Sequence, residues 1–360
     1  MRGTGNLGQG RKNPKPKIPK SQTTLTPLLI FIITALLTAL FTLLAIHLGQ
    51  RFSLVDTPGG RRQHSRPIPR IGGLGIFAGF FGVALWLFFF APPTAKHALP
   101  LSGVLIGTAF TFIFGLVDDW KEMRAWPQFA AQVIAAVIAI AATVWIEEVT
   151  LPFVGFTRFP WFITYPLTIL WITGMMNTVN FLDGLDGLAT GVAAIAALLF
   201  AAHIRRWEPN IALYALAFAG ACIGFLPFNF SPARIFLGSA GAMVVGYGLA
   251  TLSILAPARV ATALLVMAVP IADTAWQIVI RWRSGRSPFT GDRGHLHFRL
   301  LDMGFSPRWI VLAYWGFCAL FGALSLTIES RLSKLVAFVL LTVVVGGVLL
   351  VLARKVNSEQ

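Results

Sequence analysis

Two carboxamides and two carboxylates occupy every third position of an otherwise apolar segment: Asn177, Asn180, Asp183 and Asp186. On a helix each step of three residues slips by only about 60°, so neighbours in this series share a face. A carboxylate at a membrane boundary is costly and is rarely without a function. A glycine follows each aspartate and allows backbone to approach a ligand closely. These residues are suited to holding a hard cation, a nucleotide or a sugar.

A basic cluster lies in the loop 49–70, where the chain reads DTPGGRRQHSRPIPRIGG up to Gly73. The cluster includes Arg62 and His64, and arginine binds phosphate through paired hydrogen bonds. The alternative is a juxtamembrane loop that contacts anionic lipid headgroups.

Asp118 and Asp119 stand together at the end of an apolar stretch. Adjacent carboxylates repel and raise one another's pKa, so they are best tolerated near a cation. The alternative is a solvated helix terminus, which is the simpler interpretation of this pair alone.

A Gly/Ser-rich segment, Phe236 to Gly241, opens a later apolar stretch. Taken alone, it is typical of a close helix contact between small residues in a membrane.

The loop 281–308 contains arginines and the pair His295 and His297. Two residues apart, they face one way on an extended segment and diverge on a helix. A zinc site would need further ligands, and no other Cys or His lies nearby in sequence. Phosphate binding therefore fits this loop better. Asp273, inside an apolar stretch, is expected to pair with a basic group of the loop.

The elements that must position these residues are membrane helices. The 360-residue chain is 56% hydrophobic and only 12% charged, which is not the composition of an ordinary soluble domain. We expect an all-α, polytopic membrane protein of about 11 transmembrane helices, formed by a single domain over 27–353 between a basic tail (1–26) and a short C-terminal tail (354–360). The apolar stretches run over 27–48, 71–91, 100–117, 127–147, 159–180, 186–203, 210–227, 236–256, 259–281, 309–327 and 334–353.

The net charge of +15 indicates membrane lipids rather than nucleic acid as a partner, since the basic residues lie in loops and at the ends of the apolar stretches. Excluding the N-terminal tail, the excess of Lys and Arg makes the loops 49–70, 118–126, 228–235 and 281–308 and the C-terminus cytoplasmic. The basic tail contradicts this orientation. Either the tail crosses the membrane despite its charge, or the number of helices differs by one.

All the polar segments fall on this same cytoplasmic face. Carboxylates, carboxamides, arginines and histidines together suit a phosphate-bearing substrate and a divalent cation, because Mg²⁺ commonly bridges phosphates and one or two carboxylates. A transporter would place polar residues near mid-membrane and show related halves, and the sequence shows neither.

The order VDTPGGRRQHSRPIPRIGG, GLVDDW, NTVNFLDGLDGLATG, DRGHLHFRL resembles the polyprenyl-phosphate N-acetylhexosamine-1-phosphate transferase family over about residues 50–305. The resemblance implies a bacterial inner-membrane enzyme with its active site on the cytoplasmic side. It implies transfer of a sugar 1-phosphate, GlcNAc-1-phosphate by preference, from a UDP-N-acetylhexosamine to a polyprenyl phosphate such as undecaprenyl phosphate, with release of UMP. It also implies Mg²⁺, or else Mn²⁺, and makes a homodimer plausible.

By the same resemblance the acidic motifs meet the metal and the substrates. Asp118 and Asp119 would orient or deprotonate the lipid phosphate or help to hold Mg²⁺. Asp183 would be a metal ligand with Asp119, and the resemblance also assigns contacts with metal and nucleotide to Asn180 and Asp186.

The remaining motifs would bind substrate. The resemblance places Phe236 near uracil and gives Asn177 a substrate-binding role. His295 and His297 would meet the diphosphate, assisted by Arg62, His64 and Arg293.

Two positions depart from the family pattern. Ser239 occupies the place of a metal-ligand Asp in the segment FLGSAGA, and a hydroxyl is a poorer Mg²⁺ ligand than a carboxylate. Three explanations stay open: a weakened or inactive relative, a site that relies on Asp183 and Asp119, or an altered sequence. Phe298 replaces a third histidine, a change that also occurs in the translocase branch of the family.

Overall fold

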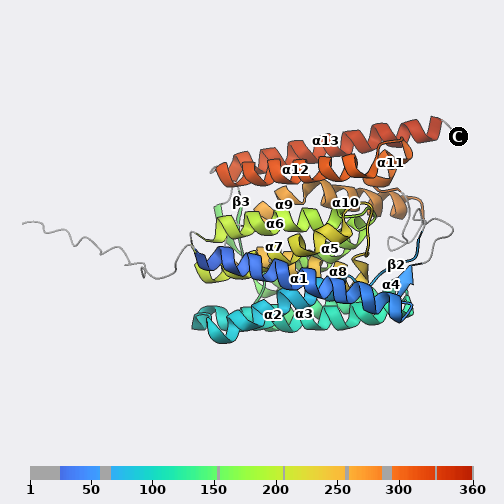
Figure 1. Cartoon of the computed structure of the whole chain (residues 1–360). Coiled ribbons are helices and arrows are strands. Elements are labelled where there is room, and N and C mark those ends of the chain that lie inside the picture. The colour runs from blue at the N-terminus through green and yellow to red at the C-terminus, as the bar shows by residue number, and fades with distance from the viewer. Residues whose placement is uncertain are drawn as a thin grey trace, which may run out of the picture.

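The computed structural model describes residues 25–56, 66–151, 155–205, 207–255, 259–285, 294–328 and 331–358. These residues form a bundle of roughly parallel and antiparallel helices with two small hairpins (Figure 1). The helices are α1 (Leu25–Arg51), α2 (Gly73–Phe90), α3 (Ala95–Lys121), α4 (Ala125–Ala141), α5 (Trp161–Leu182), α6 (Leu188–Ile204), α7 (Pro209–Asn229), α8 (Gly238–Ile254), α9 (Arg259–Val266), α10 (Ala268–Arg283), α11 (Leu296–Asp302), α12 (Pro307–Thr327) and α13 (Arg331–Ser358).

Each of the eleven apolar stretches coincides with helix in the structure, which confirms the all-α, polytopic fold class. The stretch 259–281 is the one that divides, because α9 ends at Val266 and α10 begins at Ala268. Pro270 lies in the first turn of α10, where a missing backbone N–H is tolerated. The short helix α11 lies in the loop that the sequence analysis left without structure.

Several helices are long and apolar enough to cross a bilayer: α1, from Thr26 onward, α2, α3, α7 and α12. Shorter apolar helices include α4, α6 and α8. Large apolar side chains such as Leu36 and Phe90 remain exposed on the outer helices, which is expected where lipid rather than water surrounds the protein.

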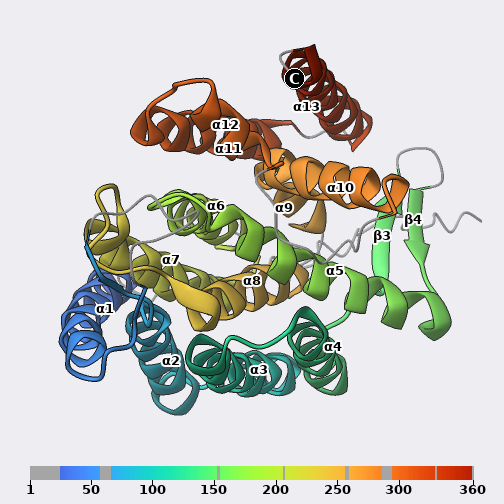
Figure 2. The same cartoon turned by 90° about the vertical axis from the view of Figure 1, so that its right-hand side faces the viewer.

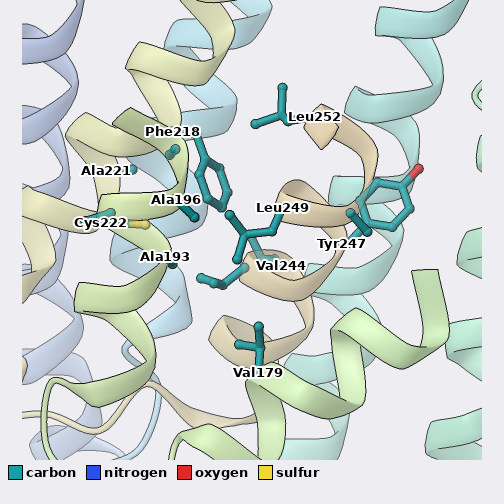
Figure 3. Packing of buried hydrophobic residues seen from close by; sticks show 14 of the residues in the cluster. Val179, Ala193, Ala196, Phe218, Ala221, Cys222, Val244, Tyr247, Leu249 and Leu252 are labelled. Carbon is teal, nitrogen blue, oxygen red and sulfur yellow. The ribbon is translucent and has the colours of Figure 1, made fainter. Parts of the chain in front are cut away.

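Helix α8 forms the centre of the bundle, and nearly all its residues are buried. It packs against α3 and α5 and also contacts α2 and α6 (Figure 2). The alanine-rich helix α6 packs on α7, and Phe218 of α7 lies beside Ala196 and Leu249 (Figure 3). The Tyr247 hydroxyl donates to the Gly103 carbonyl of α3 over 2.9 Å.

The two hairpins mark opposite ends of the bundle (Figure 1). At one end β1 (Val55–Asp56) pairs with β2 (Ile68–Pro69), with Val55 opposite Pro69. At the other end β3 (Glu148–Leu151) pairs with β4 (Gly155–Arg158). The sequence analysis did not predict either hairpin.

Candidate active site

The predicted polar segments meet at the end of the bundle that carries β2 and α11 (Figures 1 and 2). Helices α3 and α5 finish there, and α6, α8 and α11 begin there. The described parts of these segments therefore lie on one face, as the sequence predicted. That this face is cytoplasmic stays a prediction.

Asp119, at the end of α3, caps the beginning of α8. Its Oδ1 accepts the Ser239 N–H over 2.7 Å and its Oδ2 accepts the Ala240 N–H over 3.0 Å. The first N–H groups of a helix have no partner within the helix, and its N-terminus carries a partial positive charge. The buried carboxylate satisfies both needs from a neighbouring helix.

The close approach of Asp119 to α8 depends on Gly238. This residue has a φ of +73°, and a Cβ there would lie 2.9 Å from Asp119 Oδ2 and would collide with the Arg70 carbonyl. The Arg70 guanidinium adds a cation at the same place, with Nε 4.0 Å from Asp119 Oδ1 and Nη1 2.5 Å from Glu122 Oε1.

Asp118 faces the turn between α3 and α4. Its Oδ1 accepts the Met123 N–H over 2.9 Å, and the Gln128 side-chain amide lies 3.0 Å from both carboxylate oxygens. The adjacent carboxylates therefore point to different partners, Asp119 to α8 and Asp118 to the start of α4.

The every-third series does not continue on one helix, because α5 ends at Leu182. Asn177 lies within α5 and donates to Gln132 Oε1 of α4 over 2.6 Å. Asn180 is also helical and makes no side-chain hydrogen bond to any described residue. Asp183 follows the last turn, and Asp186 lies in the α5–α6 connection.

The Asp183 carboxylate makes no hydrogen bond to any described residue. Its pKa is raised well above the usual value, first by desolvation and then by the negative charges of Asp186 and Asp119. Asp186 is held by the Ala233 N–H, which its Oδ2 accepts over 3.0 Å. An excess of negative charge thus gathers at the α5–α6 connection.

The histidine loop reaches the same place. The His295 ring stacks on Phe181, the penultimate residue of α5, with centroids 5.1 Å apart. The rings of His295 and His297 lie 5.8 Å apart and only 13° from parallel. His295 is extended and precedes α11, whereas His297 is the second residue of that helix. The pair therefore joins one extended residue to the first turn of a helix, so neither sequence-based alternative, a wholly extended or a wholly helical segment, describes it.

His297 and Phe298 pack directly on Gly184. A Cβ at that glycine would lie 2.5 Å from His297 Nε2 and 2.7 Å from Phe298 Cζ. The glycine after Asp183 therefore allows the histidine loop to approach, a more specific role than the general access expected from sequence.

Asp273 of α10 anchors this loop. Its Oδ2 lies 2.9 Å from His295 Nδ1, and its Oδ1 accepts the Leu296 N–H over 3.0 Å. The prediction that Asp273 pairs with a basic group of the loop is confirmed.

Phe236 joins the site through its backbone. Its N–H donates to the Pro69 carbonyl over 2.8 Å, and its carbonyl accepts the Gly72 N–H over 3.0 Å. Phe236 is half-buried, and its contact with uracil stays a prediction. Arg62, His64 and Arg293 lie outside the described residues.

Comparison with known proteins decides the family. The sequence model of glycosyl transferase family 4 matches residues 101–257. A decaprenyl-phosphate N-acetylglucosaminephosphotransferase of Mycobacterium tuberculosis is 35% identical over 92% of this chain and 89% of that protein. The chain belongs to glycosyl transferase family 4.

Two further relatives represent two branches of the family, the N-acetylglucosaminyl 1-phosphate transferases and the phospho-N-acetylmuramoyl-pentapeptide transferases. A probable undecaprenyl-phosphate N-acetylglucosaminyl 1-phosphate transferase of Bacillus subtilis is 28% identical over 86% of this chain and 88% of that protein. A phospho-N-acetylmuramoyl-pentapeptide-transferase of Heliobacterium modesticaldum is 33% identical over 71% of this chain and 82% of that protein. The family resemblance inferred from the motifs is confirmed.

This family 4 chain has an apolar groove that the sequence analysis missed. It has a volume of about 480 Å³, lies between α5 and α10, and has Asn177 and Phe181 among its lining residues. The other lining residues are Phe129, Leu167, Leu170, Trp171, Thr173, Gly174, Met175, Thr178, Leu264, Ile271, Thr274, Ala275 and Ile278. Apolar residues of membrane helices give no sequence signal that separates a groove from a lipid-facing surface.

Buried polar partners were also missed. Gln128 and Gln132 lie four residues apart in α4 and bind Asp118 and Asn177, respectively. Residues four apart lie on one face of a helix, so this spacing of two glutamines in an apolar stretch is the signal by which the sequence could have revealed a polar helix face. Arg281 is buried beside His295 with its guanidinium over the Phe181 ring, 5.4 Å from the centroid.

The donor set suits magnesium bound together with phosphate. Among the described residues no group of three or more His, Cys, Asp or Glu side chains could hold a metal unaided. Mg²⁺ commonly takes only one or two protein carboxylates and completes its shell with water and substrate phosphates. Asp183, which has negative neighbours and no hydrogen bond within the described structure, fits that requirement.

Proposed function

We propose that this protein transfers an N-acetylhexosamine 1-phosphate, preferably GlcNAc 1-phosphate, from a UDP-sugar to a polyprenyl phosphate. The observation that carries the proposal is the meeting of Asp183, Asp119 and the His295 loop at one end of a membrane bundle. The names of the M. tuberculosis and B. subtilis relatives support the choice of sugar and lipid.

In this reaction a phosphate oxygen of the lipid attacks the β-phosphorus of the UDP-sugar. The bond from that phosphorus to the bridging oxygen breaks, and UMP leaves with the electron pair. The product is a lipid diphosphate sugar, the first intermediate of a lipid-linked envelope glycan. Because phosphoryl transfer depends mainly on positioning and charge stabilisation, the residues of the site need not bond to the substrate.

Mg²⁺, or Mn²⁺ in its place, would supply positive charge to the phosphates. Asp183 would hold the metal ion. The negative charge of the nearby Asp186 would add to the attraction, and the Ser239 hydroxyl stands at the start of α8. Asp119 keeps α8 in place by accepting two backbone N–H groups. Its carboxylate retains lone pairs with which it would also contact the metal ion. Asp118 supports the same region through Gln128 and Met123.

The apolar groove would receive the polyprenyl chain. It opens between α5 and α10 and is lined by Phe181 and Asn177 at the level of the histidine loop. A chain lying there would carry its phosphate toward Asp183 while its carbons stay out of water. The charge distribution of the loops supports a cytoplasmic orientation of this end in a bacterial inner membrane.

A second candidate function is binding of the same ligands without turnover. The observation that favours it is Ser239, a neutral residue where the family pattern has a carboxylate ligand.

UMP release by purified protein separates the two candidates. If the protein is a transferase, the wild type releases UMP when polyprenyl phosphate, UDP-GlcNAc and Mg²⁺ are present. The Asp183→Asn variant then loses most of this activity. No release by the native chain together with release by Ser239→Asp would instead establish the non-catalytic alternative.

A further inference from the structure

The groups around His295 assign each ring nitrogen a definite role. Nδ1 lies 2.9 Å from Asp273 Oδ2, and an ionised carboxylate accepts hydrogen bonds only. Nδ1 must therefore carry a proton. On the other side of the ring, Nε2 lies 3.4 Å from Arg281 Nη2. A guanidinium only donates, so Nε2 must present its lone pair.

Both neighbours select the same neutral tautomer, with the proton on Nδ1. His295 and Asp273 are each less than a twentieth exposed, so water does not compete freely for these hydrogen bonds. Stacking on Phe181 at 5.1 Å restricts rotation of the ring as well.

Asp273 also fixes the backbone beside the ring. Its second oxygen accepts the Leu296 N–H, the first amide of α11. The same carboxylate thus sets the ring orientation of His295 and the start of the helix that carries His297 against Gly184. A carboxamide at this position could accept through one oxygen only, and its NH₂ group would face the Nδ1 proton or the amide.

We propose that Asp273 is a positioning residue that acts through His295, holding the imidazole as the Nδ1–H tautomer against Phe181, a residue that lines the apolar groove. Asp273 lies in α10 and falls outside the four sequence motifs on which the family resemblance rests. The catalytic consequence of this role rests on the proposed function, whereas the tautomer itself does not.

Nitrogen-15 NMR of the full-length protein, labelled at its six histidines, tests the tautomer directly. His295→Gln identifies the signals of His295 by their loss. We expect a protonated Nδ1 and a pyridine-type Nε2 in the wild type, and a mixture of tautomers in Asp273→Asn. A wild-type spectrum with the proton on Nε2, or with both nitrogens protonated, would overturn the proposal even if Asp273→Asn does not fold.

A double-mutant cycle tests whether Asp273 acts through His295. Asp273→Asn should lower kcat for UMP release by about 10- to 100-fold, the effect that loss of the orienting carboxylate has at metal-bound histidines. In the His295→Gln background the same change should lower kcat by less than about threefold. Equal reductions in both backgrounds would refute a role through His295. Absence of UMP release by the wild type would count against the proposed function and leave the spectrum to decide the tautomer.

Discussion

His297 packs on Gly184 so closely that a methyl group at the glycine would lie 2.5 Å from the imidazole Nε2. This contact joins the aspartate-rich segment to the histidine loop. We expect Gly184→Ala to displace the loop and to cost about 1–3 kcal/mol, as overpacking does, because the added methyl would press against the buried His297 side chain. UMP release should fall strongly, and the thermal midpoint should drop.

Gly316→Ala is the matched control, since an added Cβ on this α12 glycine meets nothing within 4 Å. The control should keep wild-type activity and stability. Wild-type turnover by Gly184→Ala would show that the packing of His297 against this glycine does not matter for the reaction.

The cap that Asp119 provides to α8 predicts a stability effect. Asp119→Asn leaves only one accepting oxygen for the Ser239 and Ala240 amides, and loss of a helix cap costs about 1 kcal/mol. Thermal unfolding in detergent should show a lower midpoint. Glu122→Gln, which removes the exposed partner of Arg70, should change stability by less than about 1 kcal/mol. A larger loss in Glu122→Gln than in Asp119→Asn would contradict the cap.

The raised pKa of Asp183 predicts that Mg²⁺ affinity depends on pH. Burial and the charges of Asp186 and Asp119 make this carboxyl take up a proton at a higher pH than an ordinary aspartate. Mg²⁺ must displace that proton, so affinity should weaken as pH falls through the raised pKa. Between the unfolded and folded pKa values the folded chain binds more protons, so stability without metal should rise as pH falls.

Titration of UMP release with Mg²⁺ at several pH values measures this dependence. The pH dependence should flatten in Asp183→Asn, whose residual activity needs more Mg²⁺. An identical pH dependence in wild type and variant would remove Asp183 as the metal ligand.

The apolar groove predicts that filling it will change the KM for the lipid substrate and not the KM for the UDP-sugar. Gly174 lines the groove, and a Cβ there meets nothing within 4 Å, so Gly174→Phe should fold and fill the groove. The KM for a long-chain polyprenyl phosphate should rise severalfold, while the KM for the UDP-sugar should stay within twofold. Gly316→Phe adds the same ring to open space on α12 and should change neither value.

Much of the fold was predictable because each membrane helix needs a long apolar stretch, and eleven such stretches are visible in the sequence. The break between α9 and α10 was not, since Met267 stands in an unbroken apolar run. That Asp119, Asp183 and His295 lie close together could be predicted, because their loops were assigned to the same side of the membrane. The hydrogen-bond partner of each residue could not be predicted, because the contact of Asp119 with α8 joins residues 120 apart in sequence.

The identity of the leaving group tests the central claim most directly. A sugar-1-phosphate transferase cleaves between the two phosphates of the UDP-sugar, so it releases UMP and passes the β-phosphate to the lipid. A transferase of the sugar alone would release UDP. With UDP-GlcNAc labelled with ³²P at the β-phosphate, we predict label in the lipid product and unlabelled UMP in solution, both dependent on Mg²⁺ and on Asp183. Labelled UDP in solution and an unlabelled lipid product would contradict the account.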